Sequence, residues 1–119
     1  MNESSIEFDA VLDLCRDRHR RIALAVFEEE QRSLTVNDLT KTILKYNHQT
    51  PVTEVSEEAL TEIRVSLYRV HIPKLESVGV IEYDPERQHA EPTERFDQLR
   101  PYLSAIIDLD PTLEEPVTL

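Results

Sequence analysis

Apolar side chains recur every three or four residues along most of the chain, and short runs of β-branched and aromatic residues stand between such stretches. The first pattern is typical of helices with one buried face, and the second of short strands. The predicted elements are, in chain order, helices over residues 8–15 and 18–30, a strand over 33–36, a helix to about residue 46, a loop over 47–55, a helix over 56–78, a hairpin with strands over 80–83 and 88–91, and a helix from residue 93. The sequence therefore predicts a mainly α fold with a small β-hairpin.

Polar residues at the element boundaries support these limits. Asp17 and Ser56 are typical N-caps, and Thr35 with Asp38 has the spacing of a capping box. Gly79, the only glycine of the chain, is placed to end the long helix in the left-handed conformation. The limits outline three regions, which are a disordered N-terminus over residues 1–7, a single domain over 8–107 and an acidic, disordered tail over 108–119.

The long helix predicted over residues 56–78 has two unusual features. Pro73 interrupts its hydrogen bonding, so we expect a kink or a tightened turn near residues 69–72. It also carries two apolar stripes on largely different sides, one formed by Val65, Tyr68, Ile72 and Leu75, and the other by Leu60, Ile63, Leu67 and Val70. Either both stripes belong to the core, or one of them contributes to a subunit interface.

The chain is acidic, with 13 basic and 24 acidic residues and a formal net charge of −11. The acid excess lies at the two ends, because residues 16–80 hold ten bases and ten acids. Since a negative surface repels phosphate, we expect any anion-binding surface in this neutral middle. The acidity and the excess of arginine over lysine, ten to three, indicate a protein adapted to molar salt, and an acidic protein of ordinary salt is the alternative.

Two segments resemble winged helix-turn-helix proteins of the ArsR type. Residues 17–24, DRHRRIAL, are similar to the start of the second helix of these proteins, and residues 71–83, HIPKLESVGVIEY, are similar to the end of the recognition helix and the entry into the wing. With the acid excess, the chain resembles a family of winged-helix proteins from haloarchaea. The resemblance covers residues 8–91. It implies a recognition helix that enters the major groove of DNA, a wing that contacts the backbone, and a two-fold dimer formed by the terminal helices.

The polar wedge of the long helix supplies the candidate DNA contacts. Arg69 can bind a guanine edge or a phosphate, and Ser66 a phosphate oxygen, while Arg64 and Lys74 border the apolar stripes. The hairpin adds Arg87, although its acids depart from the basic wing of a backbone-binding protein. Candidate phosphate contacts, or alternatively partners of the acidic flanks, are Arg18, Arg20 and Arg21, and the candidate dimer interface consists of Phe8, Leu12, Phe96, Leu99, Leu103 and Ile106.

These features predict a cytoplasmic, homodimeric transcriptional regulator that binds double-stranded DNA sequence-specifically. The alternative is a winged-helix module that binds a protein and not DNA, which the acidic hairpin and the two-sided helix favour. One cysteine, Cys15, four scattered histidines and one glycine argue against a disulfide framework, a metal site and a phosphate-binding loop. We therefore expect no catalytic residue, no cofactor and no small-molecule ligand, and, from the short apolar runs, no membrane span.

Overall fold

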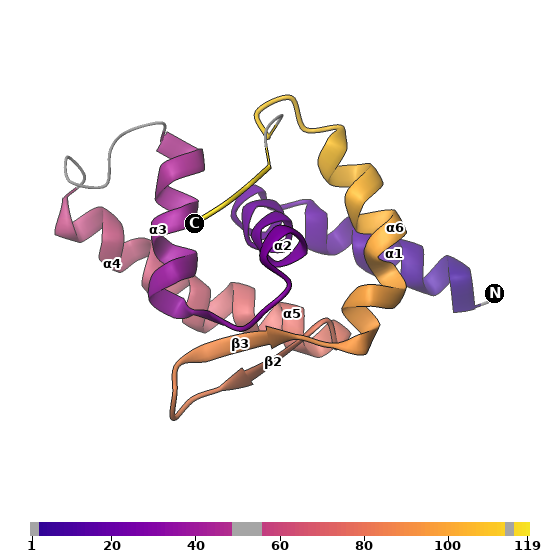
Figure 1. Cartoon of the computed structure of the whole chain (residues 1–119), viewed down its shortest axis with the longest axis horizontal. Coiled ribbons are helices and arrows are strands. Elements are labelled where there is room, and N and C mark those ends of the chain that lie inside the picture. The colour runs from indigo at the N-terminus through magenta and orange to yellow at the C-terminus, as the bar shows by residue number, and fades with distance from the viewer. Residues whose placement is uncertain (1–2, 49–55, 114–115) are drawn as a thin grey trace.

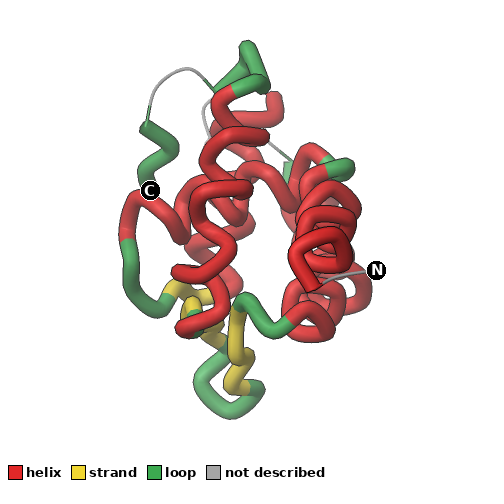
Figure 2. Tube along the Cα trace, turned by 90° about the vertical axis from the view of Figure 1, so that its right-hand side faces the viewer, coloured by secondary structure: helices red, strands yellow, loops and turns green. Residues whose placement is uncertain are grey.

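The computed structural model of the protein describes residues 3–48, 56–113 and 116–119. Its elements are, in chain order, α1 (Glu3–Cys15), α2 (Arg18–Glu30), β1 (Leu34–Thr35), α3 (Val36–His48), α4 (Glu57–Ser66), η2 (Leu67–His71), α5 (Ile72–Val78), β2 (Ile81–Asp84), β3 (His89–Pro92) and α6 (Glu94–Asp108). The predicted mainly helical fold with a β-hairpin is confirmed, and β1 joins the hairpin in an antiparallel sheet of order β1-β3-β2. Figure 1 shows α2 in the middle of the molecule, between α3 and α6, and Figures 1 and 2 both show the strands gathered at one end.

The predicted helix starts form through their predicted caps. The Asp17 carboxylate accepts hydrogen bonds from the backbone N–H groups of His19 (2.8 Å) and Arg20 (3.2 Å) and so begins α2. At α3, the Asp38 N–H donates to the Thr35 hydroxyl (2.9 Å) and the Thr35 N–H donates to the Asp38 carboxylate (3.2 Å), which is a capping box. Because these caps use side chains within three residues of the bonded N–H, the sequence is sufficient to place both starts.

The core is built around α2. Every residue from Ile22 to Phe27 is buried, so this helix has no solvent-facing side over that stretch. It packs against α1, α3 and α6, and the ring of Phe27 meets the ring of Phe96 edge-on with centroids 6.4 Å apart. Among the described residues, no helix has the length and apolar character needed to cross a bilayer.

The long helix is divided by a π-helical turn, η2. The N–H of Ile72 donates to the carbonyl of Leu67, five residues earlier, so this turn holds one residue more than an α-helical turn. Of the two expectations for residues 69–72, the tightened turn is thus wrong, because the turn is wider than an α-helical one. Pro73 supplies the physical reason, because it has no N–H for the Arg69 carbonyl and its ring crowds that carbonyl.

The extra residue joins the two apolar stripes into one core face. Each residue of an α-helix advances the side-chain direction by about 100°, so one inserted residue moves the buried face from one stripe to the other. Up to the first residue of η2 the core takes Ile63 and Leu67 from one stripe, and after η2 it takes Ile72 and Leu75 from the other. The members left outside are Val65, 40% exposed, and Val70, 49% exposed.

Both chain ends differ from the expectation. Helix α1 begins at Glu3, inside the segment expected to be disordered. The tail expected over residues 108–119 is packed in its described part, since Leu113 and Val117 are 7% and 3% exposed. The Tyr46 hydroxyl holds it further by accepting from the Thr118 N–H at 3.2 Å. The predicted loop over residues 47–55 lies outside the described residues except for positions 47 and 48, which belong to α3.

Candidate nucleic-acid interface

The outward face of the long helix forms an open hollow of about 590 Å³. Its lining among the described residues comes from α4 and η2 and consists of Glu58, Thr61, Glu62, Val65, Ser66, Arg69 and Val70. The side chain of Arg69 is exposed, as the polar wedge of the sequence predicts. The π turn is the reason that Arg69 and Val70 both lie outside, because it turns the core face toward His71 and Ile72.

The five predicted DNA contacts differ in their availability. Within the part of the chain that the structure describes, Arg64 and Arg69 have no hydrogen bond or ion pair, so both guanidinium groups are available to a ligand. Lys74 lies in an ion pair with Asp13, with Nζ 2.6 Å from the carboxylate. That contact lowers the pKa of Asp13 and places a negative charge beside the lysine. Ser66 is half-buried and its hydroxyl lies 3.2 Å from Nε2 of His71, so it belongs to an interior contact.

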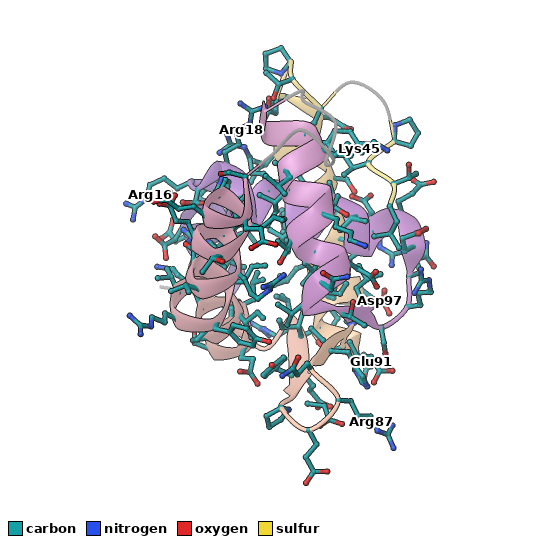
Figure 3. All side chains as sticks on the ribbon, turned by 90° about the vertical axis from the view of Figure 1, so that its left-hand side faces the viewer. Arg16, Arg18, Lys45, Arg87, Glu91 and Asp97 are labelled. Atoms are coloured by element: carbon teal, nitrogen blue, oxygen red, sulfur yellow. The ribbon has the colours of Figure 1, made fainter. Side chains whose placement is uncertain are left out.

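Arg87 is the only arginine or lysine of the hairpin and is exposed at its tip (Figure 3). Its guanidinium lies 3.9 Å from the Asp84 carboxylate. Exposed acids surround it on the hairpin, namely Glu82, Glu86 and Glu91. The hairpin therefore presents a negative surface, as the sequence predicts. Figure 3 also shows Arg87 at the opposite end of the molecule from Arg16 and Arg18, so these bases do not form one patch.

The predicted phosphate contacts on α2 are turned toward the protein. Arg20 is 5% exposed and donates to the backbone carbonyls of Leu14 (2.8 Å) and Asp13 (3.1 Å). A phosphate role for Arg20 is thus wrong for this conformation, because its donors are bound to the last turn of α1. Arg21 donates to the Asp110 carboxylate at 3.0 Å and to the Cys15 carbonyl.

Arg18 is the third of these candidates and is half-buried. It donates to the Tyr46 carbonyl at 2.9 Å and so connects the start of α2 to α3. The ion pair of Arg21 with Asp110 agrees with the alternative interpretation of the cluster, in which these arginines pair with the acidic flanks, whereas Arg18 binds a backbone carbonyl of α3.

His71, at the end of η2, lies beside Arg20 in the interior. The Arg20 guanidinium, which can only donate, approaches Nδ1 of His71 to 3.3 Å, so Nδ1 accepts and the ring proton lies on Nε2, toward Ser66. Burial lowers the pKa of His71, and the charges of Arg20 and His19 lower it further against the opposing charge of Asp17. This histidine is therefore a neutral structural link between α2 and the π turn.

Asp17, His19 and His71 are the group of described residues whose ligand atoms lie close enough for a metal ion, all within 4.8 Å. A metal on Nε2 of His71 requires a proton on Nδ1, which would then face the Arg20 guanidinium. The surroundings thus disfavour a metal. Cys15 is also unsuited to ligation, because burial raises the pKa of its thiol to about 11 despite the opposing charges of Arg21 and Arg20.

The residues of the candidate dimer interface differ in their exposure. Phe96, Leu99 and Leu103 lie in the core of this chain with at most 1% exposure, so they are not available to a second subunit in this conformation. The reason is that the apolar stripe of α6 is covered by α1 and α2 of the same chain. Phe8 and Leu12 are 42% and 44% exposed, and Ile106, half-buried, packs against the core.

Sequence reasoning missed Val65 and Val70 as parts of the outer face. A signal for them was present, because two apolar stripes that are offset across a proline indicate a change of register in the helix. The structural role of Arg20 also had a signal, since Arg20 stands at helical spacing from the buried Leu24 and Phe27.

The comparison with known proteins yields one family. A model described as a domain of unknown function, DUF7344, matches residues 12–91, about two thirds of the chain. This region begins within α1, ends within β3 and includes the hollow on the long helix. No curated protein and no solved structure matches the chain.

Proposed function

We propose that this chain, which belongs to the DUF7344 family, is a winged-helix protein of the ArsR-like, haloarchaeal type that binds double-stranded DNA. Helices α3 and α4–η2–α5 would form the helix-turn-helix unit, and the β2–β3 hairpin the wing. The order of the elements and the sheet order β1-β3-β2 support this assignment. A homodimeric, cytoplasmic transcriptional regulator is the function that this fold and the exposed helix support best.

The exposure of Arg69 is the observation that carries the proposal. It lies on the outward face of the longest helical rod, and its guanidinium has no partner among the described residues. A free guanidinium on a helix that enters the major groove can donate two hydrogen bonds to O6 and N7 of guanine. Arg64, half-buried on the same helix, supplies a second cation for a neighbouring phosphate or base.

The acidic surface has a direct consequence for the binding mode. In ordinary salt the charge of −11 opposes approach to the DNA backbone. In molar salt this repulsion is screened to a few ångströms, but the gain from counterion release is also small. Affinity must then come from base contacts and buried apolar area, so we expect sequence-specific binding that changes little between moderate and molar salt.

A dimer would present two such helices to one face of DNA. The two-fold arrangement requires half-sites about 34 Å apart, which is one turn of the double helix. Of the predicted interface residues, Phe8 and Leu12 of α1 are the ones with exposed apolar surface. We therefore propose α1 as the main part of the dimer contact.

The test is selection of bound duplexes from a random-sequence library at molar KCl, followed by fluorescence anisotropy with the selected duplex. Arg69→Ala should weaken binding about 5- to 150-fold, which is the contribution of one bidentate base contact. The control is Arg32→Ala, which removes an exposed arginine from the loop after α2 and should leave the affinity unchanged. Equal affinities of the Arg69→Ala variant and the unmodified protein would refute this placement of the helix.

The second candidate function is a protein-binding module. It is favoured by the two carboxylates, Glu58 and Glu62, that line the same hollow as the exposed valines. Such a surface suits a basic amphipathic helix of a partner protein. This function predicts that no duplex is selected at any salt concentration and that a partner retained from native lysate survives nuclease treatment.

A further inference from the structure

The hollow on α4 and η2 has a mixed chemistry that suits base edges better than phosphates. It combines the guanidinium of Arg69, the carboxylates of Glu58 and Glu62, and the isopropyl groups of Val65 and Val70. A phosphate-binding surface needs cations and backbone N–H groups, and carboxylates repel it. Base edges in the major groove instead offer acceptors on guanine, an amino donor on cytosine and a methyl group on thymine. These groups match the guanidinium, the carboxylates and the isopropyl groups, respectively.

The two valines are the least explained part of this face if no ligand is present. They are 40% and 49% exposed, although four of the other six members of the two stripes are buried and the remaining two, Leu60 and Tyr68, are partly buried against the core. Val70 adjoins Arg69 in sequence and both line the same hollow as Val65, so a base bound by Arg69 has apolar surface beside it. β-branched side chains have few rotamers, so little conformational entropy is lost when a methyl group packs on them.

We propose that Val65 and Val70 recognise the C5-methyl group of a pyrimidine next to the guanine that Arg69 binds. This inference rests on the proposed function, since it requires the long helix to lie in the major groove. The same methyl group is carried by thymine and by 5-methylcytosine, so the hollow is specific for a methylated pyrimidine edge. Glu62 would add an acceptor for the amino group of a cytosine.

The experiment uses the full chain and the duplex selected from the random library. Each thymine of that duplex is replaced in turn by deoxyuridine, which lacks only the C5-methyl group. At the thymine beside the essential guanine, binding should weaken about fourfold, the effect expected for one buried methyl group. In a parallel series, each cytosine is replaced by 5-methylcytosine, and a gain in affinity at a cytosine beside the essential guanine identifies methylated cytosine as the preferred source.

A protein variant completes the test. The double variant Val65→Ala, Val70→Ala should bind thymine and deoxyuridine duplexes equally, at the affinity that the unmodified protein has for deoxyuridine. Leu109→Ala, at an exposed leucine at the end of α6, is the control and should keep the discrimination. Circular dichroism establishes that both variants are folded.

The outcomes separate this inference from the proposed function. If a duplex is selected and Arg69→Ala weakens its binding, but no methyl substitution changes the affinity, DNA binding stands and the methyl recognition is refuted. If neither a thymine nor a cytosine stands beside the essential guanine, the inference is also refuted. If no duplex is selected, both fail together.

Discussion

Deletion of Val70 tests whether the π turn corrects the register of the long helix. In the structure, the Ile72 N–H reaches back five residues to the Leu67 carbonyl. With Val70 removed, the same two groups are four residues apart, which is the spacing of an α-helix. Leu67, Ile72 and the rest of the core face then keep their positions, and the deleted side chain is 49% exposed. We expect a loss of less than about 1 kcal/mol in the free energy of unfolding.

Deletion of Val65 is the matched control, because it removes the same residue type from the same helix at 40% exposure. Here the helix can restore α-helical spacing only by turning Leu67 about 100° away from the core. Leu67 is 0% exposed in the folded protein, so its loss from the core costs about 1.5–3 kcal/mol. In a chain of this size this corresponds to a melting temperature about 5–15 °C lower.

Thermal unfolding followed by far-ultraviolet circular dichroism compares the two deletions with the unmodified protein in the same buffer. The melting temperature should fall slightly for the Val70 deletion and strongly for the Val65 deletion. If the Val70 deletion lowers the melting temperature as much as the Val65 deletion does, the role assigned to the extra residue of η2 is refuted.

Three further predictions concern the interior and the tail. Arg20→Leu should lower the free energy of unfolding, measured with urea, by about 3–5 kcal/mol, because the carbonyls that Arg20 binds lose their charged donor. The control Arg16→Leu, at a 77% exposed side chain, should lower it by less than about 0.5 kcal/mol. Burial lowers the pKa of His71 in the folded state, so the unfolded state binds more protons and stability should fall as the pH drops through the ordinary value of 6.5. This decline should be absent in His71→Gln, and an unchanged decline would assign it to another group. Val117→Ala should lower the free energy of unfolding by about 1–2 kcal/mol, and no change would mean that the tail does not pack in solution.

The elements of this fold that the sequence predicts well are those with local causes. The starts of α2, α3, α4 and α6 depend on a cap whose partner N–H lies two or three residues away. Gly79 ends α5 at φ 86°, a left-handed conformation that glycine adopts without steric cost. Such signals are contained in a few consecutive residues and need no knowledge of the tertiary structure.

The misjudged features depend on distant contacts. The tail resembles a disordered segment in composition, yet Leu113 and Val117 find a surface on α2 and α6 that no local pattern reveals. The charge of Arg20 suggests solvent, while its donors bind the end of α1. The candidate DNA surface was predictable in part, because the polar wedge identifies Arg69. The π turn that brings Val70 beside Arg69 was not, because it depends on the packing of both halves of the long helix against the same core.

The enclosure of α2 limits how the molecule can be controlled. Six successive residues, each at most 6% exposed, leave almost no surface at which an effector can touch the middle of this helix while the domain is closed. A signal must therefore enter through the periphery, by way of α1, the hairpin or the terminal segment that lies over the core. The same enclosure means that the amides of α2 exchange with solvent only when the whole domain opens, so their exchange rates report its global unfolding equilibrium.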